Sequence, residues 1–203
     1  MASLSTLDLS SIDEAVDAAF EPLRGNPQID NAAAVISNLA DYGLVWVALA
    51  ALKARRRGPN RRRAIFALAT AGFSSLIVSR VVKAAVARER PEDHLEATVR
   101  TPTSSSFPSG HTLAAFCTAF VLADSDLQTA TNVGFATAVA ASRVHLRAHH
   151  PTDVIGGAAI GSVLGLGLRP IVNAITPGTK RTRRGRPKKE RGMGRTEVVL
   201  QRL

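Results

Sequence analysis

The sequence predicts an all-α protein, a polytopic transmembrane helical bundle with about five spans and an amphipathic helix at the N-terminus. Two observations lead to this prediction. The chain has 203 residues, of which 45% are hydrophobic, and it still carries a formal net charge of +10, a combination that fits apolar spans joined by basic loops. Residues 33–53 and 64–87 are long apolar runs, and a span needs about 20 such residues. A fold stapled by intrachain disulfides is excluded, because Cys117 is the only cysteine.

The N-terminal part differs in character from the rest of the chain. Residues 7–23 place apolar side chains among acidic ones at helical spacing, which predicts an amphipathic helix. Such a helix lies on a membrane or packs by one face on the rest of the protein, and the pattern fits both. We divide the chain into an N-terminal amphipathic segment (1–31), a membrane domain (32–178) and a basic tail that we expect to be disordered (179–203).

Three further apolar segments follow the first two runs. Residues 111–123, 128–142 and 154–175 continue the pattern, although the first two of these are short for a span. The last segment has three glycines at four-residue spacing, namely Gly157, Gly161 and Gly165. This spacing allows close approach of helix backbones in a membrane. In a soluble helix each glycine would cost about 1 kcal/mol relative to alanine, so a soluble helical bundle is the less favoured alternative.

The distribution of basic residues predicts the orientation in a cell membrane. Loop 54–63 contains six arginines, and short loops this basic stay in the cytoplasm. Counting spans forward from there places loops 88–110 and 143–153 on the extracytoplasmic face. From Lys180 onward the chain has ten basic residues against two acidic ones, which predicts a cytoplasmic tail that attracts anionic lipids.

Ionisable residues stand inside or at the ends of the predicted spans. They are Asp41, Arg80 and Lys83. Because a charge at membrane depth is expensive, such residues mark a pathway or a site. We expect Asp41 to pair with a buried cation, which the sequence does not identify.

The two predicted outside loops gather residues that suit phosphoryl transfer. Lys83 ends a span, Arg90 follows in the first loop and Arg143 begins the second. These three cations would neutralise phosphate oxygens, and the arginines would give forked hydrogen bonds. Ser109 is a good N-cap for the helix expected to start near His111. A helix N-terminus beside a glycine, here Gly110, is a ready anion site.

The second loop adds a histidine and an aspartate at short spacing. His149 and Asp153 flank Thr152, a candidate cap for the last span. A histidine held by an aspartate is a nucleophile with a fixed tautomer. A second histidine, His111, would protonate the leaving oxygen, because its ordinary pKa lies near neutrality. We expect no metal and no cofactor. A metal site at His149 and its neighbour His150 is a weaker alternative, because no further ligands complete it.

Three segments together resemble the motifs of a known family. They are KAAVARERP at residues 83–91, PSGH at 108–111 and SRVHLRAHHPTD at 142–153. In this order they resemble the three motifs of the type 2 phosphatidic acid phosphatase superfamily, over roughly residues 64–170. That superfamily includes lipid phosphate phosphatases, glucose-6-phosphatase, bacterial acid phosphatases and vanadium haloperoxidases.

The resemblance implies a role for each site residue. His149 would attack phosphorus and become a phosphohistidine, and Asp153 would orient it. His111 would act as general acid to the leaving group and then as base for water. The residues that would hold the phosphoryl group are Lys83, Arg90, Ser109, Gly110 and Arg143. The remaining histidines, His94, His145 and His150, we expect to be ordinary loop or core residues.

The predicted function is therefore that of a metal-independent membrane phosphatase acting on the extracytoplasmic side. The membrane context favours a lipid phosphate substrate, a monoester or a diphosphate. Candidates are polyprenyl diphosphate, a polyprenyl-phosphate sugar phosphate and phospholipid phosphates. The abundance of alanine and arginine is typical of a GC-rich bacterial source and favours a cell-envelope polyprenyl substrate.

Three alternatives stay open at this point. A vanadium haloperoxidase-like oxidoreductase would use the same pocket, but those relatives are soluble, so the apolar spans disfavour it. A membrane scaffold whose tail recruits partners is disfavoured by the complete motifs. The run RGRPK at residues 184–188 resembles an AT-hook, which binds A·T-rich DNA in the minor groove. Orientation rules and anionic lipids alone account for a basic tail, so we do not expect nucleic acid as a partner.

Overall fold

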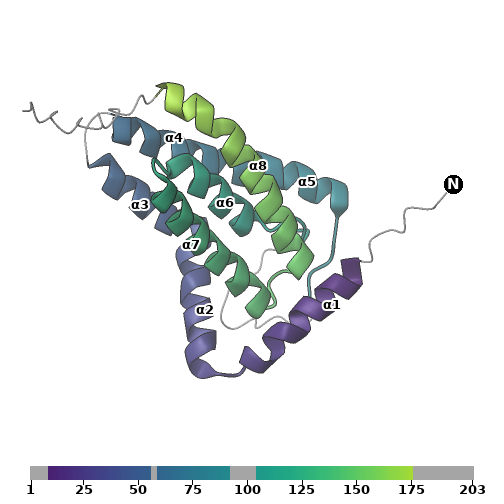
Figure 1. Cartoon of the computed structure of the whole chain (residues 1–203). Helices are drawn as coiled ribbons and strands as arrows, with labels where there is room; N and C mark the ends of the chain where they lie inside the picture. The colour runs from purple at the N-terminus through teal and green to yellow at the C-terminus, as the bar shows by residue number, and fades with distance from the viewer. Residues whose placement is uncertain (1–8, 56–58, 92–103, 176–203) are drawn as a thin grey trace, which may run out of the picture.

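The computed structural model describes residues 9–55, 59–91 and 104–175. These residues are folded into helices joined by short connections, with no strand among them (Figure 1). The α-helices are α1 (Leu9–Phe20), α2 (Pro27–Ala40), α3 (Leu44–Ala54), α4 (Pro59–Phe73), α5 (Ser79–Val86), α6 (Gly110–Leu122), α7 (Asp126–His145) and α8 (Pro151–Ile175). The prediction of an all-α fold is confirmed. The basic tail, residues 179–203, lies outside the described residues.

The first predicted span is a helix pair with a break in the middle. A 3-10 turn at Asp41–Gly43 separates α2 from α3, and the two helix axes differ by 60°. Gly43 has a φ of 68°, a left-handed conformation that glycine adopts without a steric penalty. This turn ends α2 and puts Asp41 at the bend.

Two helices are long and apolar enough to cross a membrane, and the bent α2–α3 pair would make a third. The first is Asn60–Val86, where a π-helical turn at Ser74–Val78 joins α4 to α5, and the second is α8. Helix α6 is apolar, but it has only 13 residues, fewer than a straight span requires. All five predicted apolar segments are thus helical, and five as the number of spans stays a prediction.

The core of the bundle is built around α6. Helices α4, α7 and α8 pack against it. A Cβ atom on Gly157 of α8 would lie 2.7 Å from the carbonyl oxygen of Ser109, and one on Gly165 would lie 2.8 Å from that of Cys117. Gly161, midway between them, is closer still to the α6 backbone. The predicted close approach along this glycine stripe is confirmed.

The outward faces of the helices carry many large apolar side chains. Exposed examples from α2, α3, α4, α5 and α8 are Val35, Leu39, Leu52, Ile65, Val81, Val163 and Leu166. So many exposed large apolar side chains on the outward faces of several helices are typical of helices that face lipid. Together with the long apolar helices, this surface indicates a membrane protein.

Basic side chains complete the end of the bundle where α6 stops. The last carbonyl groups of a helix lack partners within the helix. Lys53 donates to the carbonyl oxygen of Leu122 at 2.6 Å, and Arg63 donates to that of Ala123 at 2.5 Å. At the other end of α6, the Ser109 N–H donates to the carbonyl oxygen of Asp153 at 3.0 Å. Lys53 and Arg63, at either end of the arginine-rich run, and the motif residues Ser109 and Asp153 therefore lie at opposite ends of α6.

Helix α1 lies across the end of the bundle that carries the motif-bearing loops, where it contacts α7 and α8 (Figure 1). Its Asp13 side chain is buried against the start of α8. Directly after α1, Arg24 donates to the carbonyl oxygens of Val144 at 3.1 Å and His145 at 3.0 Å. The predicted amphipathic helix thus packs by one face on the rest of the protein.

Candidate active site

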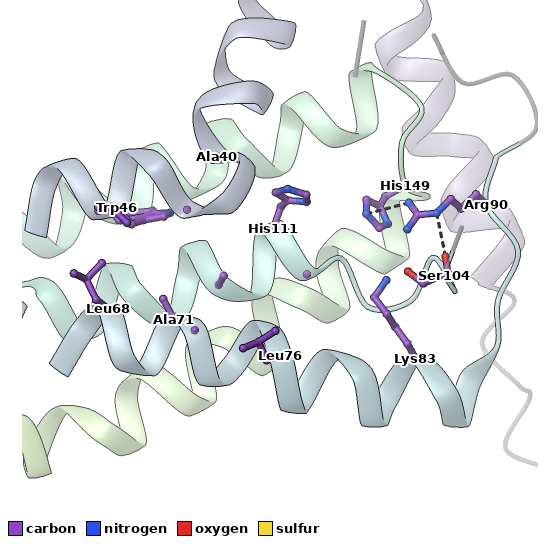
Figure 2. Close-up of a pocket in the computed structure, with 15 residues that line it drawn as sticks. Ala40, Trp46, Leu68, Ala71, Leu76, Lys83, Arg90, Ser104, His111 and His149 are labelled. Carbon is purple, nitrogen blue, oxygen red and sulfur yellow. Dashed lines mark hydrogen bonds between the residues drawn. The ribbon is translucent and has the colours of Figure 1, made fainter. Parts of the chain in front are cut away.

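A cavity of about 520 Å³ opens at the end of the bundle where the predicted site residues lie. Its two ends differ in chemistry (Figure 2). Polar side chains line one end, and apolar side chains from α3, α4 and the π-helical turn line the other. The polar lining residues are Lys83, Arg90, Ser104, His111 and His149, with Gly110 beside them, and the apolar ones include Trp46, Val47, Leu68, Ala71 and Leu76.

His149 lies in the loop between α7 and α8 and is buried. Its Nδ1 is 3.6 Å from Oδ2 of Asp153, slightly beyond hydrogen-bond distance. Asp153, in the first turn of α8, is itself fixed from two sides. Its Oδ2 accepts the His150 backbone N–H at 2.9 Å, and its Oδ1 accepts from Arg88 at 2.8 Å. The other ring nitrogen of His149, Nε2, lies 3.4 Å from Nη1 of Arg90.

The surroundings of His149 keep its imidazole uncharged. Burial, assisted by the positive charges of Arg90 and Arg143, lowers the pKa of His149 to about 3, although the Asp153 carboxylate opposes this shift. A neutral imidazole whose proton sits on Nδ1, toward the carboxylate, has a free electron pair on Nε2. That is the protonation state that a nucleophilic histidine requires.

The three predicted phosphate-binding cations lie around His149. Arg90 donates to the carbonyl oxygens of Ala148 at 2.7 Å and Ser104 at 3.2 Å. Lys83, from the last turn of α5, reaches the same cavity. Arg143 is fully buried, and its Nη1 donates to the Ser37 hydroxyl. Within the described part of the chain, Nε and Nη2 of Arg143 have no hydrogen-bond partner.

His111 stands in the first turn of α6 and also lines the cavity. Its Nε2 lies 2.7 Å from Oδ1 of Asp41, at the bend between α2 and α3. The sequence marked Asp41 as a charge within an apolar segment that would pair with a cation it did not identify. The structure pairs it with the predicted general acid.

Two capping predictions are wrong in detail. Ser109 occupies the N-cap position of α6, but its hydroxyl accepts from the Thr112 hydroxyl at 3.1 Å and caps no backbone N–H. Thr152 does not cap α8, because that helix already begins at Pro151, whose fixed φ suits the first helical position. The Thr152 N–H and hydroxyl instead donate to Asp13, at 2.7 and 3.0 Å.

Sequence reasoning missed a charge network behind the site. Arg88 donates to Asp13 at 2.5 Å and, through its other terminal nitrogen, to Asp153 at 2.8 Å. Although burial opposes it, these two carboxylates raise the pKa of Arg88. Little in the sequence indicated this network. Arg88 stands two residues before Arg90 in the same motif and is not distinguished from it, and Asp13 is one of several acidic residues in α1.

Neither His145 nor His150 lines the cavity. His145 is buried and pairs through Nε2 with Asp30 at 2.7 Å. His150 is half-buried, whereas His94 lies outside the described residues. Across residues 9–55, 59–91 and 104–175, no three His, Cys, Asp or Glu side chains are grouped so that they would bind a metal ion.

Comparison with known proteins gives relatives for this arrangement. The decaprenylphosphoryl-5-phosphoribose phosphatase of Mycolicibacterium smegmatis is 35% identical over 144 residues, which cover 70% of this chain and 77% of the relative. The protein of the same name from Mycobacterium tuberculosis is 30% identical over 151 residues, covering 73% and 81%.

A solved structure and a family model agree with these relatives. The fold matches the crystal structure of a transmembrane PAP2-type phosphatidylglycerolphosphate phosphatase from Bacillus subtilis with a TM-score of 0.66 and 26% identity, over 89% of this chain and 92% of that one. The sequence model of the PAP2 superfamily matches residues 62–177, more than half of the chain. With this match and with phosphatases as its relatives, the chain belongs to the PAP2 superfamily and is a phosphatase.

Proposed function

We propose that this phosphatase hydrolyses a lipid-linked phosphate monoester or diphosphate through a phosphohistidine on His149. The observation that carries the proposal is the cavity with two unlike ends (Figure 2). Lys83 and Arg90 meet His149 at one end, whereas apolar side chains such as Trp46 and Leu76 line the other. An amphiphilic substrate suits this cavity, because its phosphate would lie among the cations and its chain along the apolar wall.

The proposed reaction has two displacement steps. In the first, Nε2 of His149 attacks phosphorus, and His111 gives a proton to the departing oxygen of the alcohol or phosphate. In the second, His111 takes a proton from water, the water oxygen attacks phosphorus, and the bond from phosphorus to Nε2 breaks. Lys83, Arg90 and Arg143 would offset the negative charge on the non-bridging oxygens in both transition states. No step requires a metal ion.

The relatives narrow the substrate class. Those from M. smegmatis and M. tuberculosis are named for decaprenylphosphoryl-5-phosphoribose, a polyprenyl-phosphate sugar phosphate. The structural neighbour from B. subtilis is named for phosphatidylglycerolphosphate. A polyprenyl-phosphate sugar phosphate is therefore our first candidate, ahead of phosphatidylglycerol phosphate, polyprenyl diphosphate and phosphatidic acid.

The assay is phosphate release by the detergent-purified protein in EDTA, across these four lipids, with His149→Ala and the neighbouring control His150→Ala. We expect release from one lipid, complete loss in His149→Ala and most of the activity in His150→Ala. Equal loss in both variants would refute the assignment of the nucleophile. Activity that EDTA abolishes and a metal restores would refute the metal-free reaction. Halide oxidation with vanadate and peroxide, without phosphate release, would favour a haloperoxidase instead.

We also propose that the protein crosses the membrane several times, with the site on the extracytoplasmic face. The basic tail would lie in the cytoplasm and contact anionic lipids. The chain would divide into its N-terminal segment, membrane domain and tail after residues 31 and 178. Support for the sidedness comes from Arg63, the last residue of the arginine-rich run, which bonds at the end of α6 opposite the site. Cys117 is buried, so a single added cysteine reports its own position. An impermeant thiol reagent should label Glu89→Cys on intact cells and Leu127→Cys only after permeabilisation, and the reverse pattern would place the site in the cytoplasm.

A further inference from the structure

Helix α2 and the turn that follows it contact two predicted site residues, although the helix and the turn both lie outside the three family motifs. Ser37 and Asp41 are four residues apart, a spacing that puts side chains on one helical face. Ser37 accepts a hydrogen bond from Arg143, and Oδ1 of Asp41 lies 2.7 Å from Nε2 of His111. The family match begins at residue 62, so this contribution comes from a part of the chain that the motifs do not cover.

The pairing determines which nitrogen of His111 is available for proton transfer. An ionised carboxylate accepts hydrogen bonds and donates none. The Nε2 atom of His111, 2.7 Å from Asp41, therefore carries a hydrogen in both protonation states of the ring. Only Nδ1 is left to give a proton to a leaving oxygen or to take one from water.

The charges around the cavity give the carboxylate a second role. Lys83 and Arg90 line the same cavity as His111, and Arg143 is buried nearby. A protonated imidazole in the company of three cations is disfavoured, and a carboxylate in direct contact offsets that repulsion. The break at Asp41–Gly43 ends α2 where this carboxylate meets α6.

We propose that Asp41 is a positioning residue for the general acid His111, an inference that rests on the proposed function above. Asp41 holds the Nε2 proton in place and directs Nδ1 to the chemistry. In the first step the Nδ1 proton passes to the leaving oxygen as the P–O bond breaks and the bond to His149 forms. In the second step Nδ1 recovers a proton from the attacking water, and the P–N bond breaks to release phosphate.

The test compares two substrates that differ in their need for acid catalysis. An aliphatic alcohol leaves poorly without a proton, whereas 4-nitrophenolate leaves readily without one. We would measure kcat/KM for a long-chain alkyl phosphate and for 4-nitrophenyl phosphate, because kcat/KM reports the steps up to departure of the leaving group. The variants are Asp41→Asn, His111→Ala, the double variant and Asp41→Glu. A misfolded fraction lowers both constants equally, so the ratio of the two constants does not depend on folding yield.

The matched control is Asp30→Asn. Asp30 also lies on α2 and also pairs with a histidine, His145, at 2.7 Å, but His145 does not line the cavity. This substitution removes the same kind of histidine–carboxylate contact without touching His111. It should leave the ratio of the two kcat/KM values at the wild-type value.

We expect Asp41→Asn to lower kcat/KM for the alkyl phosphate about 100-fold and for the aryl phosphate less than about 3-fold, within the range of general acid catalysis. Asp41→Glu should recover part of the loss, and the double variant should be no worse than His111→Ala. If His149→Ala is inactive, equal losses of kcat/KM on both substrates would overturn the role of Asp41. Losses that add in the double variant would overturn it as well. An active His149→Ala, or a His111→Ala variant that does not discriminate between the substrates, would refute the proposed function itself.

Discussion

Arg143→Met should make the protein more stable and abolish its response to phosphate. Arg143 is fully buried, donates through Nη1 to Ser37, and has no partner for Nε or Nη2 among the described residues. Methionine is shorter than arginine but has a similar volume and no charge. The substitution therefore removes an incompletely satisfied buried cation and the donors that we assign to the substrate phosphate.

The size of the effect follows from these contacts. A buried donor without a partner costs about 1–3 kcal/mol, Arg143 has two of them, and the charge-assisted bond to Ser37 contributes about 1.5–3 kcal/mol. Replacing the guanidinium should thus raise the free energy of unfolding by about 1–4 kcal/mol, the gain observed when buried ions are replaced by apolar residues. For a chain of this length that corresponds to about 2–4 °C in Tm per kcal/mol.

The assay is thermal unfolding in detergent, with and without orthovanadate as a phosphate analogue. At a ligand concentration about 100-fold above Kd, the wild type should gain about 2.7 kcal/mol, and Arg143→Met should gain almost nothing. The control is Arg63→Met, because Arg63 is also buried but donates to Ala123 and Asn173 at the opposite end of the bundle. That variant should lose stability and keep the response to vanadate. A lower Tm for Arg143→Met together with an intact vanadate response would refute the reasoning.

Three further outcomes are expected. Gly161→Ala should lower the free energy of unfolding by about 1–3 kcal/mol, because the added Cβ would clash with the α6 backbone. Gly167→Ala is the control: no atom lies within 4 Å of the added Cβ, so this substitution should raise the free energy of unfolding by up to about 1 kcal/mol. Acidification should destabilise the fold through His149, because the pKa of this histidine falls from 6.5 to about 3 on folding. Between these two pH values the unfolded chain binds more protons than the folded one, so the free energy of unfolding decreases as the pH drops below about 6.5. Unfolding curves at several pH values should show a smaller decrease in His149→Gln. Asp13→Ala should release α1, because it removes the bonds to Arg88 and Thr152, and unchanged amide exchange in α1 would contradict this role.

The sequence was sufficient to predict features that depend on local patterns. Apolar runs predicted the five helical segments, and the four-residue spacing of Gly157, Gly161 and Gly165 predicted close contact with another backbone. The three motifs identified the loops that meet at one end of the bundle. These predictions succeeded because helical periodicity and glycine spacing act within a few turns of the chain.

Features that depend on contacts between distant segments were not predicted. Asp41 and His111 are separated by 70 residues, and Asp13 and Thr152 by 139. No periodicity links such pairs, because the contacts exist only after α1 and α2 have packed on the bundle. The prediction that Thr152 caps α8 was wrong for a related reason. Pro151 already satisfies the first helical position of α8, so the Thr152 side chain was free to bond to a residue from α1.

The missed contacts nevertheless share an origin that the sequence contains. The first 41 residues have seven acidic side chains and one basic one, Arg24, whereas the motif-bearing loops are rich in arginine and histidine. In the structure, five carboxylates of this segment contact motif residues, namely Asp13 with Arg88, Asp17 and Glu21 with Arg147, Asp30 with His145 and Asp41 with His111. A site that binds phosphate needs cations, and cations that do not touch the phosphate need counter-charges of their own. We therefore interpret the acidic N-terminal segment as a source of counter-charges for arginines around the site, such as Arg88 and Arg147, while Nε and Nη2 of Arg143 have no hydrogen-bond partner among the described residues.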